Sequence, residues 1–176
     1  MSLGLLQRLD RLARNLTPLT LSLLLVIISA TPLRIPDFGP VAPNVGLIAA
    51  YYWGIYRPDL FPALAAFAVG LWQDILVGTP LGMNALVLLA IHWFILSQRR
   101  FFQGKSFAVV WWAFALVAIA MAILLWLIAM AYHGRLLDAT PAAFQAVLTV
   151  ALYPFLTWVF ARTQHAVLRQ ALDVSR

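Results

Sequence analysis

The sequence predicts an all-α fold, a polytopic membrane bundle of about six transmembrane helices with both termini in the cytoplasm. The first observation is composition: 64% of the 176 residues are hydrophobic, only 10% are charged, and the mean hydropathy is +0.90. The second is that the apolar residues form long runs separated by short polar or proline-rich segments. The third is that the 12 Lys and Arg residues lie beside these runs, which suits membrane topology better than nucleic-acid binding.

A single integral membrane domain is expected to cover residues 1–176. Its segment 1–16 places Arg8, Arg11 and Arg14 between leucines at helical spacing, which is typical of an amphipathic helix on a membrane surface or of a solvated basic tail. The predicted spans are 17–33, 41–56, 60–77, 83–97, 107–132 and 141–161. A polar cytoplasmic tail follows at 162–176. The second span reaches only about 20 to 24 Å, so we expect it to be shielded by neighbours or to start within the bilayer.

The basic residues indicate the orientation of these spans. With both termini inside, ten of them are cytoplasmic and only Arg34 and Arg135 lie outside, as the positive-inside rule requires. The ten are Arg8, Arg11, Arg14, Arg57, Arg99, Arg100, Lys105, Arg162, Arg169 and Arg176. The prolines and the glycine between residues 34 and 44 predict an irregular external loop. Residues 98–105 predict a basic inner loop.

Two groups of side chains inside the spans allow more than one interpretation. An aromatic group at the inner end of the second span is typical of an interfacial belt, although it also suits a partner surface. This group consists of Tyr51, Tyr52, Trp53 and Tyr56. His92 lies in the fourth span, where a histidine that satisfies a hydrogen bond is more common than a metal ligand. No second His or acid stands three or four residues away to help it bind a metal.

The sequence lacks the residue patterns that most enzymes need. It contains no cysteine and no glutamate, and its three histidines fall in different regions. No Gly-rich phosphate loop is present, and no nucleophile, base and metal ligand converge in one segment. We therefore expect no catalytic residue, no cofactor and no metal site.

One polar stretch, residues 70–84, interrupts the apolar sequence. Asp74 lies late in the third span, where an unpaired aspartate costs roughly 2.5 to 3.5 kcal/mol on insertion scales. Gly70, Asp74 and Gly78 recur every four residues, so on a helix they form a stripe that another helix can approach closely. In one interpretation Asp74 caps backbone N–H groups or meets Asn84 across the glycine-bounded turn, and serves folding alone. In the other it belongs to a proton, ion or ligand site.

These residues resemble a known family. The pattern, which includes Arg57-Pro58 before the third span, is similar to the signature of MreD, the rod shape-determining membrane protein. It continues as Phe67-x-x-Gly70-x-x-x-Asp74-x-x-x-Gly78-x-Pro80-Leu81-Gly82-x-Asn84-Ala85-Leu86. Outside residues 57–86 the likeness lies in length and hydropathy. The resemblance implies a structural motif and assigns no catalytic residue. The motif consists of Gly70, Asp74, Gly78, Pro80, Gly82 and Asn84.

The resemblance also implies a function and a set of partners. A member of this family is expected to be a non-enzymatic scaffold of the bacterial cell-elongation machinery in the inner membrane. It would bind the single-span protein MreC and help organise peptidoglycan synthesis, with RodA, a class B penicillin-binding protein, MreB and membrane lipids as further partners, and a homodimer as a further option. Family members are similar in fold to the S-components of vitamin transporters, so the alternative is a ligand-binding subunit of a small-molecule carrier. A membrane enzyme acting on lipid-linked sugars is a third hypothesis.

Overall fold

The computed structural model describes the backbone of residues 2–30, 33–35, 39–102 and 104–173, and the side chains of 16–30, 41–102 and 104–164. This part of the chain forms six helices and one two-stranded sheet. In chain order they are α1 (Ser2–Ser29), β1 (Leu33–Ile35), β2 (Gly39–Val41), α2 (Val45–Tyr56), α3 (Ala63–Val77), α4 (Met83–Phe102), α5 (Phe107–His133) and α6 (Thr140–Asp173). The predicted all-α class is confirmed, with one short hairpin added.

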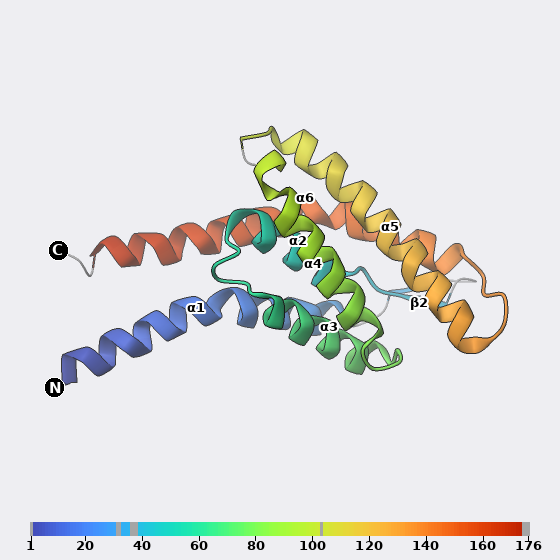
Figure 1. Cartoon of the computed structure of the whole chain (residues 1–176), viewed down its shortest axis with the longest axis horizontal. Coiled ribbons are helices and arrows are strands. Elements are labelled where there is room, and N and C mark those ends of the chain that lie inside the picture. Colours follow the sequence, from blue (N-terminus) through green and yellow to red (C-terminus); the bar gives the residue numbers. More distant parts are fainter. Residues whose placement is uncertain (1, 31–32, 36–38, 103, 174–176) are drawn as a thin grey trace.

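The short helix α2 lies at the centre of the bundle. It contacts α1, α3, α4 and α6, and every residue from Val45 to Ile55 is buried. Helices α3 and α4 form one hairpin, and α5 and α6 form another (Figure 1). The described start of α1 and the described end of α6 lie at the same end of the molecule (Figure 1). Neighbouring helices therefore shield the second predicted span, 41–56, of which only the 12 residues of α2 are helical.

Within the described residues, three helices are long and apolar enough to cross a membrane. They are α4, α5 and the Thr140–Gln164 part of α6. The Leu16–Ser29 part of α1 and the helices α2 and α3 are apolar but shorter. A chain with these helices is a membrane protein, because apolar helices of this length match the thickness of a bilayer core.

Several helices have ends that differ from the predicted ones. Helix α1 runs unbroken from the predicted amphipathic segment into the first predicted span, and it ends at Ser29 instead of residue 33. Helix α4 continues into the predicted basic loop because Arg99 and Arg100 are good helix formers and suit the C-terminal end of a helix. Helix α6 continues through the predicted tail to Asp173. The side chains of Arg8, Arg11, Arg14, Arg34, Arg169 and Arg176 lie outside the described ones.

The prediction of an irregular loop at residues 34–44 is wrong where the two strands pair. Leu33 pairs with Val41 and Ile35 with Gly39, in an antiparallel register. The proline at position 40 is compatible with this hairpin, because a two-stranded sheet consists only of edge strands, where a missing N–H is tolerated. The amide of Gln145 in α6 donates to the carbonyl just after β2, that of Ala42, at 3.1 Å.

A proline inside α6 is matched by a donor from α5. Pro154 has no N–H, so the carbonyl of Val150 lacks its usual partner four residues on. The indole Nε1 of Trp111 in α5 donates to that carbonyl at 3.1 Å. This bond ties the two helices of the second hairpin together and satisfies a backbone group that would otherwise be unpaired in an apolar environment.

Candidate functional site

The end of α3 forms a turn that encloses Asp74. The helix ends at Gly78, whose φ of 76° lies in the left-handed region that favours glycine. The N–H groups of Gly78 and Thr79 donate to the Asp74 carbonyl at 3.0 and 3.2 Å. Gly82, with a φ of 95°, then leads the chain into α4. The Asp74 side chain is 0% exposed and lies against the first residues of α4.

Five donors surround the carboxylate of Asp74. Its Oδ1 accepts from Thr79 Oγ1 at 2.7 Å, from the Asn84 N–H at 3.0 Å and from Asn84 Nδ2 at 2.9 Å. Its Oδ2 accepts from the N–H groups of Gly82 at 2.9 Å and Ala85 at 3.4 Å. The first N–H groups of a helix have no partner within that helix, and they favour a negative charge. The carboxylate therefore caps the N-terminus of α4 from the end of α3.

This geometry uses both carboxylate oxygens of Asp74 as hydrogen-bond acceptors. Backbone N–H groups and the amide nitrogen of Asn84 can only donate. The hydroxyl of Thr79 accepts from that amide at 3.2 Å, so its own proton is free to point at Oδ1 of Asp74. These contacts are the ones that the folding interpretation of Asp74 requires, including the predicted contact with Asn84.

Gly70 lies where α3 and α4 approach most closely. A Cβ atom added at Gly70 would lie 2.5 Å from Cα of Ala85 and 2.8 Å from its N. Backbone atoms cannot move aside as a side-chain end can, so a larger residue would force the helices apart. Close approach through small residues is the usual way in which membrane helices pack.

The structure brings the six predicted motif residues together at the α3–α4 turn. Gly78 and Gly82 are required by their backbone conformation, since an added Cβ would meet nothing within 4 Å. The carbonyl of Pro80 accepts from the Met83 N–H at 3.1 Å. Sequence reasoning left out Thr79 from the motif, although a hydroxyl five residues after a buried acid is within reach across such a turn. It also missed Gln73, which is buried beside Gly46 of α2.

His92 is buried in α4, with 1% of its surface exposed. Its ring lies beside the backbone of Ala50 in α2, but neither ring nitrogen reaches good hydrogen-bond geometry with a described residue, so the expected hydrogen bond is a weak one here. The ring packs edge-on against Phe61, with centroids 5.8 Å apart. In the described part of the chain, no group of three His, Cys, Asp or Glu residues is placed to hold a metal ion.

The prediction of an interfacial belt is wrong for three of the four aromatic residues in α2. Tyr51, Tyr52 and Trp53 are at most 4% exposed, and only Tyr56, at 44%, faces outward. The hydroxyl of Tyr51 donates to the Val110 carbonyl at 3.0 Å, across to α5. The physical reason is the central position of α2, which places its residues up to Ile55 inside the bundle.

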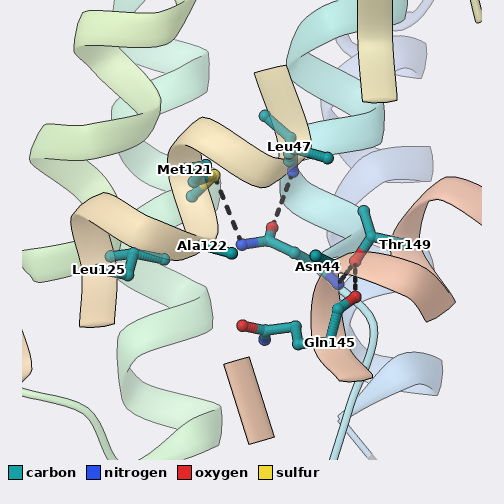
Figure 2. A pocket seen from close by; sticks show the side chains of 9 residues that line it. Asn44, Leu47, Met121, Ala122, Leu125, Gln145 and Thr149 are labelled. Carbon is teal, nitrogen blue, oxygen red and sulfur yellow. Dashed lines mark hydrogen bonds between the residues drawn. The ribbon is translucent and has the colours of Figure 1, made fainter. Parts of the chain in front are cut away.

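A small pocket lies where the start of α2 meets α5 and α6 (Figure 2). The buried side chain of Asn44 projects into it. Its Oδ1 caps α2 by accepting from the Leu47 N–H at 2.9 Å, and its Nδ2 donates to Sδ of Met121 at 3.6 Å (Figure 2). The cavity volume is about 10 Å³, which is room for about one water molecule and far below the roughly 300 to 1,000 Å³ typical of small-molecule sites. Its lining is completed by Ala118, Ala122, Leu125, Gln145, Ala146 and Thr149.

The fold and the site define a small helical membrane protein in which a buried acid closes the turn between two helices. A family model described as rod shape-determining protein MreD matches residues 10–163, and the chain belongs to the MreD family. It is therefore a rod shape-determining membrane protein, from a family that is structural and not a known family of enzymes. No curated protein and no solved structure matches the chain. The expected likeness to vitamin-transporter S-components stays a prediction.

Proposed function

We propose that this protein is a non-enzymatic, multi-pass scaffold of the bacterial inner membrane. It binds an MreC-like single-span protein and helps to organise peptidoglycan synthesis during cell elongation, with both termini in the cytoplasm. Through this complex, the protein associates with RodA, a class B penicillin-binding protein and MreB. The family supports the cell-shape role, and the remaining statements are the hypothesis to be tested.

The observation that supports the scaffold role is that the turn and the start of α4 supply the hydrogen bonds to the Asp74 carboxylate. Both carboxylate oxygens accept hydrogen bonds from the turn and from the start of α4. A catalytic acid or base must come within hydrogen-bond reach of its substrate, whereas Asp74 is 0% exposed and both its oxygens are engaged by the turn and α4. The one acid inside a predicted span is therefore better suited to fixing the shape of a docking block than to chemistry.

The surface available for a partner is largely that of α5. Of its residues, five are buried, and bulky apolar side chains such as Leu116, Ile123 and Leu127 are exposed. A membrane helix of a partner fits such a face, because helices in lipid associate through packing of apolar and small side chains. Small residues alternate with these side chains, among them Ala120.

Co-purification tests this proposal directly. The chain is co-expressed with an MreC-like protein, extracted in mild detergent and captured by a tag. We expect MreC to be retained at a defined stoichiometry. If MreC is present in the membrane at comparable levels and is never retained, the scaffold proposal is wrong.

The Asp74→Asn variant separates the scaffold from an enzyme acting on lipid-linked sugars. Asparagine keeps the size and one acceptor oxygen, so we expect MreC retention and cell shape to stay largely normal. Asp138→Asn, on an exposed loop, is the control. Loss of function with normal folding and normal MreC retention would instead assign proton chemistry to Asp74.

The carrier alternative concerns the pocket beside Asn44. Its polar lining, with Gln145 and Thr149 from α6, is what a ligand would contact. Its size argues against a vitamin, because a cavity of about 10 Å³ holds about one water molecule. A tight vitamin complex in native mass spectrometry would revive this alternative.

A further inference from the structure

One end of the bundle carries a concentration of unpaired positive charge. The α2–α3 and α4–α5 turns lie at the end from which the start of α1 and the end of α6 extend (Figure 1). Among the described side chains, this end carries Arg57, Arg99, Arg100, Lys105 and Arg162, with Asp59 as the acid. Asp59 is paired with Arg57 at 3.1 Å. The other four cations have no ion pair within the described residues.

Three of these cations lie at the α4–α5 turn, whose backbone is anchored to the bundle. Arg99 and Arg100 form part of the last turn of α4, where a positive charge is favoured by the helix dipole. The ring of Phe102 is buried against that of Tyr51, with centroids 6.0 Å apart, and this contact anchors the turn to α2. The N–H of Lys105 donates to the Phe102 carbonyl at 3.2 Å.

Exposed aromatic rings lie next to these charges. The ammonium of Lys105 lies 5.4 Å from the ring centroid of Phe101, which is 57% exposed. On α6, the guanidinium of Arg162 lies 5.4 Å from the ring centroid of Trp158, which is 58% exposed. An exposed ring beside a cation at the end of an apolar helix is typical of the level at which lipid headgroups meet the hydrocarbon core.

We propose that the α4–α5 turn is a binding site for the phosphate of anionic phospholipids, with Arg99, Arg100 and Lys105 as its ligands. Charge complementarity identifies the occupant. None of the three cations forms an ion pair among the described residues, and Asp59, which attracts Arg99 electrostatically, is itself paired with Arg57. The excess positive charge matches the negative charge of an anionic lipid phosphate.

Exposed apolar side chains continue along α4 from this turn, at Phe101, Phe94 and Trp93, and suit contact with acyl chains next to the headgroup. An acidic soluble segment would gain nothing from those apolar neighbours. This site is independent of MreC binding.

The test measures lipid preference in native mass spectrometry of the full chain. Phosphatidylglycerol and phosphatidylcholine with identical acyl chains are titrated onto the detergent-solubilised protein. Each basic side chain near an anionic headgroup is worth about a fivefold change in affinity. We therefore expect the triple variant R99Q/R100Q/K105Q to lower the preference for phosphatidylglycerol by at least about tenfold.

Two further variants serve as controls. Arg100→Gln removes one charge of the proposed site, and Arg135→Gln is its matched control. The control removes one exposed arginine at the opposite end and should change the preference for phosphatidylglycerol by less than about twofold. The variant R99K/R100K keeps the charges and should keep the preference. Should the triple variant misfold, the wild-type preference is measured at rising salt and should fall as the charges are screened.

Three outcomes overturn this proposal. They are a wild-type protein without preference for the anionic lipid, a preference that the triple variant retains, and an equal loss in Arg135→Gln. A retained preference would leave the basic turn as a site for an acidic protein segment. Because MreC retention is measured separately, failure of the lipid site leaves the scaffold proposal untouched.

Discussion

Helices α2 and α5 are both strongly apolar, yet they occupy opposite environments. Helix α2 has 12 residues and is buried from Val45 to Ile55, whereas the 27-residue α5 has only five buried residues. In a bilayer, an apolar side chain has a similar free energy against lipid and against protein, so hydropathy does not distinguish the two helices. Small residues and polar groups with partners do distinguish them. Gly46 and Gly54 of α2 lie against side chains of other helices, and Tyr51 has its hydroxyl bonded across the bundle.

The strongest test of the difference between interior and exposed helix faces is a substitution at Gly70, in the interior contact between α3 and α4. We expect Gly70→Leu to destabilise the protein by about 3 kcal/mol or more, because its Cβ would collide with the backbone of Ala85. The matched change on the exposed face of α5, Ala120→Leu, should alter stability by less than about 0.5 kcal/mol. Thermal unfolding in detergent measures both. Equal stability of the two variants would contradict the close contact.

The next effect concerns the Asp74 cap. Asp74→Leu leaves the N–H groups of Gly82, Asn84 and Ala85 without their acceptor, and each buried orphan costs about 1 to 3 kcal/mol. Some relaxation of the turn offsets part of this, so we expect a loss of about 2 to 3 kcal/mol. The Asn variant keeps one acceptor and should lose clearly less. A leucine variant as stable as wild type would show that the turn does not depend on the acid.

Removing one hydroxyl from α2 should have a smaller effect. Tyr51→Phe deletes the donor to the Val110 carbonyl, and we expect a loss of about 1 kcal/mol. Tyr132→Phe in α5 is the control, because that side chain is 68% exposed. Differential scanning fluorimetry of both variants checks the difference. If the control were the more destabilised of the two, the assignment of inner and outer helices would be reversed.

The turn that follows α2 carries an exposed ion pair with a weaker effect still. The hydrogen bond from Arg57 holds the pKa of Asp59 below its usual value of 3.8. A lowered pKa means that the stabilisation is complete above pH 3.8 and is lost as the pH falls through the lowered value. Solvent screening keeps it small, so we expect Asp59→Asn to cost less than about 0.5 kcal/mol near neutral pH. A larger loss in a neutral-pH melt would indicate a further role for Asp59.

Sequence patterns predicted the helical class and the composition of the Asp74 turn, because both depend on local features. An acid and three glycines at four-residue spacing in an apolar run define a close contact and a turn without knowledge of the fold. The burial of Tyr52 and Trp53 was not predictable, since an interfacial and an interior aromatic residue look alike in sequence. The β1–β2 pairing was missed for a related reason: the prolines around it signal a turn, and the register depends on tertiary contacts such as the one from Gln145.

A substitution on the exposed face of α5 should have the smallest effect on stability and the largest effect on binding of the MreC-like partner. Leu116 is 70% exposed, so Leu116→Ala removes few protein contacts and should change stability by less than about 0.5 kcal/mol. Phe114 on the opposite face is 0% exposed, and Phe114→Ala should cost about 3 kcal/mol or more. If α5 binds the partner, Leu116→Ala will weaken MreC retention at unchanged stability. If retention is unchanged as well, this position faces lipid, and the partner surface lies on another helix.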